Sequence, residues 1–150
     1  MSGRPFLQTP GPTNVALGKP ATADSTCNSA ETPDKAVDGT VANNSKWCSL
    51  GSTKWWRVDL GSSYAIRSFT LRHAGDGGET ASWNTRDFDL QVSSDGANWT
   101  TVVQARGNTA NISTHDLASP VTGRYVRLNV ITPTQTSDTA ARVYEVEVYA

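Results

Sequence analysis

The sequence predicts an all-β fold, because short runs of alternating apolar and polar residues recur and helical periodicity is nearly absent. Clusters of Gly, Asn, Asp and Ser separate these runs, and such residues favour turns. About eight runs at this spacing, without intervening helices, indicate a β-sandwich.

The expected strands are the runs in which apolar residues alternate or cluster between turn signals. They cover residues 14–19, 55–60, 64–73, 88–92, 99–103, 124–130 and 143–149. Asp95 and Gly96 separate two of them and predict a hairpin turn, because this pair tolerates positive φ. In the last run Val146 and Val148 alternate with two glutamates, which gives one apolar and one polar face. We expect this strand to pair near the first.

Length and charge limit the classes of function. The 150 residues fit one domain, and 13 Lys+Arg against 14 Asp+Glu leave a net charge of -1. A near-neutral chain argues against nucleic acid and against a polybasic membrane anchor. No apolar run approaches the roughly 20 residues that span a bilayer, so we expect no membrane insertion. Residues 1–13 are polar and proline-rich and are predicted to be a linker or an expression remnant, without a signal peptide.

The two cysteines, Cys27 and Cys48, flank one loop and no zinc-ligand spacing accompanies them. We interpret them as a disulfide that closes a loop of about 22 residues and contributes about 3 kcal/mol. Two free buried thiols are the alternative. A disulfide, together with few charges and many Thr, Ser and Asn residues, favours a secreted, extracellular protein.

Oxygen-bearing side chains are concentrated in the loop 33–47. They are Asp34, Asp38, Thr40, Asn43, Asn44 and Ser45. A hard cation such as Ca²⁺ takes six to eight oxygen ligands, so this loop is a candidate calcium site. The alternative is that Asp38 caps a turn and Glu145, in the last run, is a solvated strand residue.

The segment 72–87 combines three glycines with side chains suited to sugar recognition. They are His73, Glu79, Trp83, Asn84 and Arg86. Sugar hydroxyls need hydrogen-bond donors and acceptors, and the apolar face of a sugar ring packs on an aromatic ring. The structural alternatives are that His73 caps a strand, that Arg86 pairs with a carboxylate, and that Trp83 folds onto the core. Gln135 and Asp138, in a later loop, are further candidates.

An ordered series of phrases gives the chain a family resemblance. The phrases occupy residues 14–21, 35–39, 55–61, 92–99, 124–128 and 144–149. Together they resemble the discoidin domains, also called coagulation factor V/VIII C-type domains, and within these the family 32 carbohydrate-binding modules. The resemblance covers residues 14–150, which we take as one module. It implies an eight-stranded antiparallel jelly-roll sandwich, a structural calcium ion, and a sugar site on loops at one end.

The resemblance also implies roles for particular residues. The calcium ligands would be the carbonyl groups of Lys35 and Tyr144 and the side chains of Asp38, Thr40, Asn43 and Glu145. The loop before Trp47 is longer than the common pattern, so Ser45 could replace Asn43. Galactose-binding members commonly use a histidine, an arginine, an asparagine and an aromatic residue. Arg86 is the best positional match and His73 the next, although their spacing differs from the commonest galactose pattern.

We therefore expect a monomeric, non-catalytic module that binds a glycan, either of the galactose or GalNAc type or another polysaccharide. It would target a secreted glycoside hydrolase or a related protein to that glycan. A phospholipid- or protein-binding adhesion domain of the discoidin type is the alternative. An enzyme is disfavoured, because there are two histidines and no hydrolase, zincin or P-loop motif.

Overall fold

The computed structural model describes residues 13–150, so the predicted linker lies outside the described residues apart from Thr13. Within this range there are seven strands and four short 3₁₀ helices. The strands are β1 (Ala21–Ala23), β2 (Trp47–Ser49), β3 (Trp55–His73), β4 (Asp87–Ser93), β5 (Thr100–Ala105), β6 (Ile112–Thr132) and β7 (Ala141–Tyr149). The 3₁₀ helices are η1 (Pro33–Val37), η2 (Ala42–Asn44), η3 (Ala74–Gly77) and η4 (Ala81–Trp83). No helix in this part of the chain is long and apolar enough to cross a bilayer.

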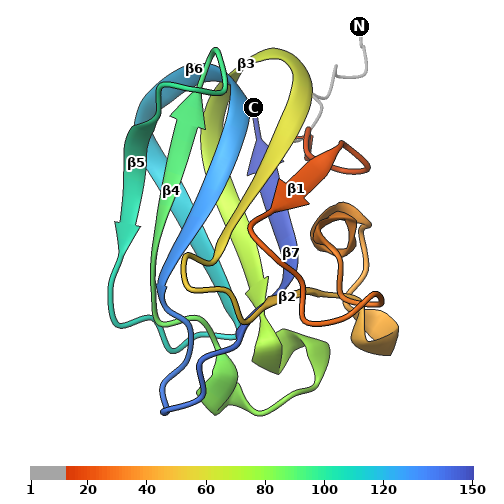
Figure 1. Cartoon of the computed structure of the whole chain (residues 1–150). Helices are drawn as coiled ribbons and strands as arrows, with labels where there is room; N and C mark the ends of the chain where they lie inside the picture. The colour runs from red at the N-terminus through yellow and green to blue at the C-terminus, as the bar shows by residue number, and fades with distance from the viewer. Residues whose placement is uncertain (1–12) are drawn as a thin grey trace, which may run out of the picture.

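The strands form a jelly-roll sandwich, because β3 and β6 are long, bend, and serve both layers (Figure 1). The first half of β3 and the second half of β6 pair with each other and join β1, β4 and β5 in one layer. The second half of β3 and the first half of β6 pair again and join β7 and β2 in the other layer. All pairs are antiparallel. The predicted fold class is confirmed.

The strand count differs from the expected eight because two predicted strands are continuous. Residues 55–60 and 64–73 are parts of β3, which bends where its pairing with β6 shifts between Asp59 and Tyr64. Gly61 adopts φ +87 in this bend, a conformation that side chains rarely allow. The strand predicted at residues 14–19 is wrong, because residues 15–18 form a turn and β1 begins at Ala21. An isolated bridge between Asn14 and Tyr149 still places this segment beside the last strand, as expected.

The core lies between the two layers and follows the alternation of the strands. Trp56, Val58 and Leu128 from one layer are fully buried, as are Phe69 and Val146 from the other. Because alternate residues point to opposite faces, the intervening polar residues lie on the outside of the sandwich.

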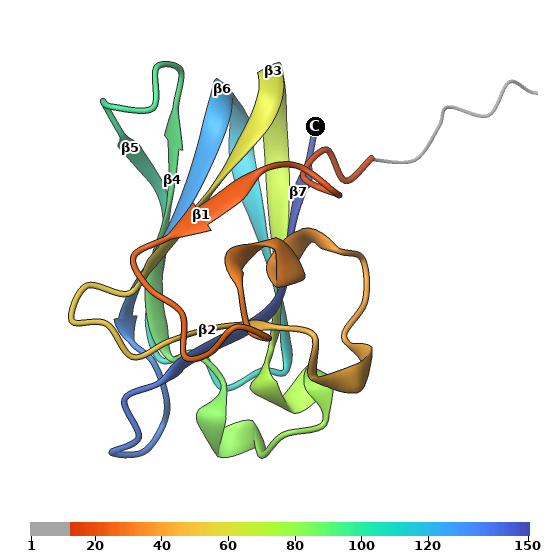
Figure 2. The same cartoon turned by 45° about the vertical axis from the view of Figure 1, so that its right-hand side comes forward.

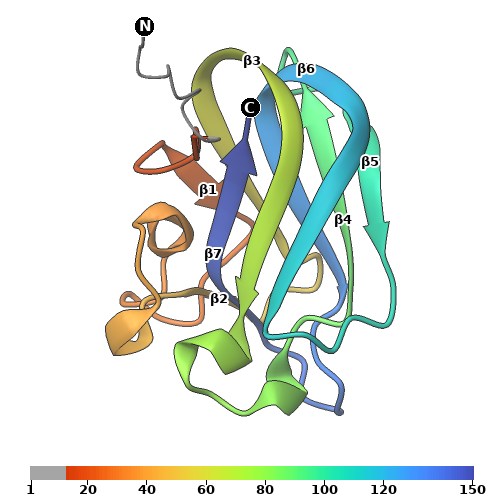
Figure 3. The same cartoon turned by 180° about the vertical axis from the view of Figure 1, so that it is seen from behind.

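Loops gather at one end of the sandwich, which is at the bottom of Figure 1. This loop-bearing end carries η3 and η4, the loop 106–111 and the loop 133–140. Figure 2 shows η1 and η2 as a separate lobe beside β1 and β7, and Figure 3 shows the same arrangement from behind. The predicted disulfide is confirmed, since Cys27, in the segment before η1, is bonded to Cys48 in β2.

Candidate functional site

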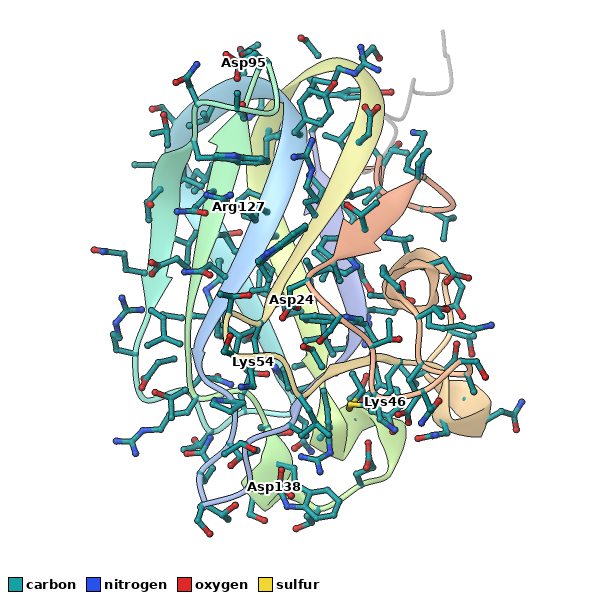
Figure 4. All side chains as sticks on the ribbon, viewed as in Figure 1. Asp24, Lys46, Lys54, Asp95, Arg127 and Asp138 are labelled. Carbon is teal, nitrogen blue, oxygen red and sulfur yellow. A yellow bond between two sulfur atoms is a disulfide. The ribbon has the colours of Figure 1, made fainter. Side chains whose placement is uncertain are left out.

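Trp83 lies in the loop-bearing end, at the end of η4. Its indole is partly exposed, and the guanidinium carbon of Arg142 lies 4.0 Å from the ring centroid. Arg142 is the second residue of β7, and its Nη1 and Nη2 each lie 3.1 Å from a carboxylate oxygen of Asp138. Trp83, Arg142 and Asp138 therefore form one group in which an aromatic ring, hydrogen-bond donors and acceptors lie together. Figure 4 shows Asp138 at this end.

Glu79 connects this group to the lobe of η1 and η2. Its Oε2 accepts a hydrogen bond of 2.6 Å from the Tyr144 hydroxyl and lies 3.2 Å from Lys46 Nζ, and its Oε1 lies 3.8 Å from Arg142 Nε. Lys46 is 4% exposed and also pairs with Glu31 at 2.7 Å. Burial and the neighbouring Glu79 carboxylate raise the pKa of Tyr144 well above its usual range. The network thus holds Glu79 and Arg142 in fixed positions.

The prediction that His73 faces the ligand is wrong. His73 is completely buried at the end of β3, where its Nε2 lies 2.8 Å from the Ser113 hydroxyl and its ring packs 5.7 Å from Phe88. Burial, helped by the nearby His115, lowers the pKa of His73 to about 4, so the ring is neutral at pH 7. The alternation of β3 explains the position, because Phe69, Leu71 and His73 share its inner face.

The prediction for Asn84 is wrong for a similar reason. Its side chain is completely buried and accepts a hydrogen bond of 2.8 Å from Gly75 N. Its amide group donates to Thr109 O at 3.1 Å and to Asn111 Oδ1 at 2.9 Å. Asn84 therefore joins three loop segments and has no side-chain atom left for a sugar.

The remaining predicted ligand residues lie in two different places on the loop-bearing end. Glu79 and Trp83 are brought together through Arg142, as described above. Arg86 is exposed just before β4, and within residues 13–150 it forms neither an ion pair with Glu79 nor a cation–π contact with Trp83. Gln135 is occupied as well, because its amide donates to Asn84 O and Asn108 O at 2.9 and 2.8 Å.

Sequence reasoning missed Arg142 and Lys46. Arg142 directly precedes the last predicted run and follows a loop that was expected to reach the ligand end, so its position on the chain was a usable signal. Lys46 carries no comparable signal, because its partners Glu31 and Glu79 are 15 and 33 residues away in the chain.

The second feature is a pair of carboxylates where η1 meets β7. Glu145 is 2% exposed, its Oε1 accepts a hydrogen bond of 3.2 Å from Gly39 N, and its Oε2 has no hydrogen-bond partner among residues 13–150. Burial and the adjacent Asp38 carboxyl raise the pKa of Glu145 to about 9. The Ser45 hydroxyl donates to Asp38, whose other oxygen accepts from Thr40 N at 3.2 Å. Two facing carboxylates with an unpartnered buried oxygen fit a cation.

The other predicted metal ligands lie around this pair. Thr40 belongs to the same loop and, with Gly39 and Glu145, lines a cavity of about 330 Å³. Lys35 lies in η1 and Tyr144 directly precedes Glu145, so both carbonyl groups come from adjoining segments. Asn43 is exposed in η2 at φ 57, whereas Ser45 contacts Asp38. The geometry therefore favours Ser45 over Asn43.

The architecture and the loop-bearing end define the class of this chain as a small β-sandwich binding domain. Residues 35–128, more than half of the chain, match the family model described as "NedA-like, galactose-binding domain". The chain belongs to this family, one of the F5/F8 type C domains. The resemblance inferred from the sequence is thereby confirmed.

Solved structures agree with this assignment. The family 32 carbohydrate-binding module of EndoD from Streptococcus pneumoniae is 28% identical, with a TM-score of 0.79 over 91% of this chain and 99% of that chain. Chitosan-binding module 1 from a chitosanase/glucanase of Paenibacillus sp. IK-5 is 28% identical, with a TM-score of 0.75 over 92% of this chain and 99% of that one.

The family 32 module of NanJ from C. perfringens, solved in complex with galactose, is 16% identical and shares the fold, with a TM-score of 0.76 over 93% of this chain and 98% of that chain. In a separate comparison, no curated protein matches the sequence.

Proposed function

We propose that the chain is a non-catalytic module that binds carbohydrate at its loop-bearing end. The observation that carries the proposal is the clustering of the partly exposed Trp83 and Asp138 around Arg142 at this end, in a domain similar over nearly its whole length to carbohydrate-binding modules. These are the chemical groups that a sugar ring and its hydroxyls require.

In this proposal the indole of Trp83 is the platform for the apolar face of a sugar ring. Arg142 already covers one face of the indole, so the sugar would use surface that Arg142 leaves free. The carboxylates of Asp138 and Glu79 would accept hydrogen bonds from sugar hydroxyls, and Arg142 would donate to them. Arg86, which is exposed, would contact a longer oligosaccharide from the side.

We further propose that Asp38 and Glu145 hold a structural Ca²⁺. Thr40, Ser45 and the carbonyl groups of Lys35 and Tyr144 would complete an all-oxygen ligand set, as this ion prefers. The bound ion would neutralise the two facing carboxylates and tie the lobe of η1 to β7. We assign it no part in ligand chemistry.

The wider setting is part of the same proposal. Residues 14–150 would be one monomeric module of a larger secreted chain, and they would direct a glycoside hydrolase or a related protein to its glycan. The disulfide between Cys27 and Cys48 supports secretion, because such bonds persist in oxidising compartments.

Calorimetric titration against galactose, N-acetylgalactosamine, chitotriose and a neutral glucan tests the function. We expect binding of at least one of them in the range of about 0.1–1 mM, because an open site buries little of a small ligand. The recovered oligosaccharide should be chemically unchanged. Hydrolysis would indicate an enzyme. Sedimentation with phosphatidylserine vesicles and no binding to any sugar would instead support the adhesion alternative, for which the exposed Leu50 is a candidate contact.

A further inference from the structure

The outer face of the layer formed by β3, β6 and β4 carries two arginines away from the loop-bearing end. Their chain neighbours Trp56, Val58, Val126 and Leu128 are buried in the core. Because side chains alternate along a strand, Arg57 and Arg127 point outward. Figure 4 shows Arg127 on the sheet, apart from Lys46 and Asp138 at the lower end of the molecule.

Arg57 and Arg127 lie directly opposite each other in the pairing of β3 with β6. Like charges at opposed positions destabilise a sheet. Within residues 13–150 neither arginine forms an ion pair, whereas two other arginines that contact this layer are neutralised. Arg124 lies 2.8 Å from Asp59, and the guanidinium of Arg106 lies 3.1 Å from Asp89. The two opposed charges are therefore left without a counter-charge.

Aromatic rings and two hydrogen bonds hold these guanidinium groups in place. The ring centroid of Trp99 lies 4.3 Å from the guanidinium carbon of Arg127 and 5.3 Å from that of Arg57. The Tyr125 ring lies 5.2 Å from Arg57. Arg127 Nε donates to Gln91 at 2.7 Å, and Arg57 Nη1 donates to the carbonyl of the turn glycine at position 96 at 3.2 Å.

Within residues 13–150, most of the N–H donors on this pair have no hydrogen-bond partner. A guanidinium has five N–H groups, and each arginine uses one nitrogen for the hydrogen bond described above. Gly96 itself adopts φ +77, a backbone conformation that favours glycine, and its carbonyl group faces Arg57. Partial burial and the charge of Arg57 lower the pKa of Arg127, which a bound anion would counteract.

We propose that Arg57 and Arg127, supported by Trp99, form a second ligand site that binds an oxyanion of an acidic polysaccharide. The shared chemistry is a carboxylate or sulfate group, which the planar fork of arginine binds in a bidentate manner. A polysaccharide with regularly spaced anions should bind this sheet face more tightly than a free ion does, because several linked anionic groups can bind at once. The site is separate from Trp83 and does not depend on the function proposed for the loop-bearing end.

Affinity electrophoresis through gels that contain polygalacturonate, dextran sulfate or uncharged dextran tests the proposal. The protein should be retarded by at least one acidic polymer and not by dextran. Removing both charges by Arg57→Gln and Arg127→Gln should weaken this binding at least about tenfold, because charge-assisted hydrogen bonds are lost. Arg127→Lys keeps the charge but loses the fork, and it should also weaken binding.

Arg67→Gln is the matched control, because Arg67 is exposed on β3 and its replacement removes one charge elsewhere. It should leave the retardation unchanged, whereas Arg127→Gln should reduce it. Melting temperatures establish whether each variant is folded. If the double variant is not folded, the Arg127→Lys variant tests the proposed site in its place.

Four results would overturn the proposal. The first is equal loss of binding in Arg67→Gln and Arg127→Gln, which would mean general charge attraction. The second is loss of acidic-polymer binding in Trp83→Ala, which would place the ligand at the loop-bearing end. The third is absence of binding. The fourth is competition by inorganic sulfate as effective as the polymer at equal sulfate concentration. If binding is absent, the two arginines serve only to hold Trp99.

Discussion

The loop-bearing end has an inner group and an outer group of side chains, which contain similar residue types but have different roles. His73 and Asn84 lie inside, completely buried and bonded to neighbouring loops. Trp83 and Asp138 lie outside and are partly exposed, and both contact Arg142, whose side chain is 11% exposed. Trp83 and Asn84 are adjacent in sequence, yet one is partly exposed and the other is completely buried. The comparison shows that burial, not residue type, separates the groups that can bind from those that hold the loops.

Replacing Asn84 by Ala is the strongest test of the structural role of the inner group. The change removes three hydrogen bonds and leaves buried partners unpaired, so the free energy of unfolding should fall by about 3 kcal/mol. Urea unfolding measures it. Asn129→Ala on the outward face of β6 is the control and should change stability by less than about 0.5 kcal/mol. Equal effects of the two variants would mean that Asn84 is not a structural anchor.

The melting temperature with and without Ca²⁺ tests the proposed metal site at Asp38 and Glu145. At about 100 times its dissociation constant, Ca²⁺ should add about 2.7 kcal/mol and raise the melting temperature by about 8 °C over the value in EGTA. Glu145→Gln should abolish this rise and, in EGTA, be at least as stable as the parent, because an amide carries no charge that must be buried beside Asp38. Asp34→Asn in the same loop should keep the rise. A melting temperature insensitive to calcium would refute the site.

The pH dependence of stability tests the burial of His73. Its pKa is about 4 in the folded chain and about 6.5 when unfolded, so the unfolded state binds the additional proton in this window. The contribution of His73 is therefore complete above pH 6.5 and is lost as the pH falls towards 4, by about 3 kcal/mol. His73→Gln should remove this part of the slope. An unchanged slope would show that His73 is accessible to water.

Much of the fold could be predicted from the sequence, because strands that bury one face carry a period of two. The runs at 88–92 and 143–149 lie within β4 and β7. The bend of β3 was not predictable in the same way, since Gly61, Ser62 and Ser63 read as the end of a strand. Its continuity depends on pairing with β6, some 60 residues away in the chain.

The candidate site was predicted less completely. The sequence placed chemically suitable residues in one loop, and Trp83 and Glu79 do lie together near the surface. It did not reveal that the partners of Asn84 are Thr109 and Asn111, 25 and 27 residues further on. Nor did it show that His73 continues the inner face of β3. Polar residues that are satisfied by distant loops look the same in sequence as polar residues that face solvent.

The most direct test of the account is to compare Trp83→Ala with Asn84→Ala in calorimetric titrations with the sugar that binds best. The account predicts that Trp83→Ala weakens binding at least about tenfold while the free energy of unfolding changes by less than about 1 kcal/mol. Asn84→Ala should lose stability, and its folded fraction should retain most of the affinity. Undiminished affinity in a folded Trp83→Ala variant would contradict the assignment of the sugar site.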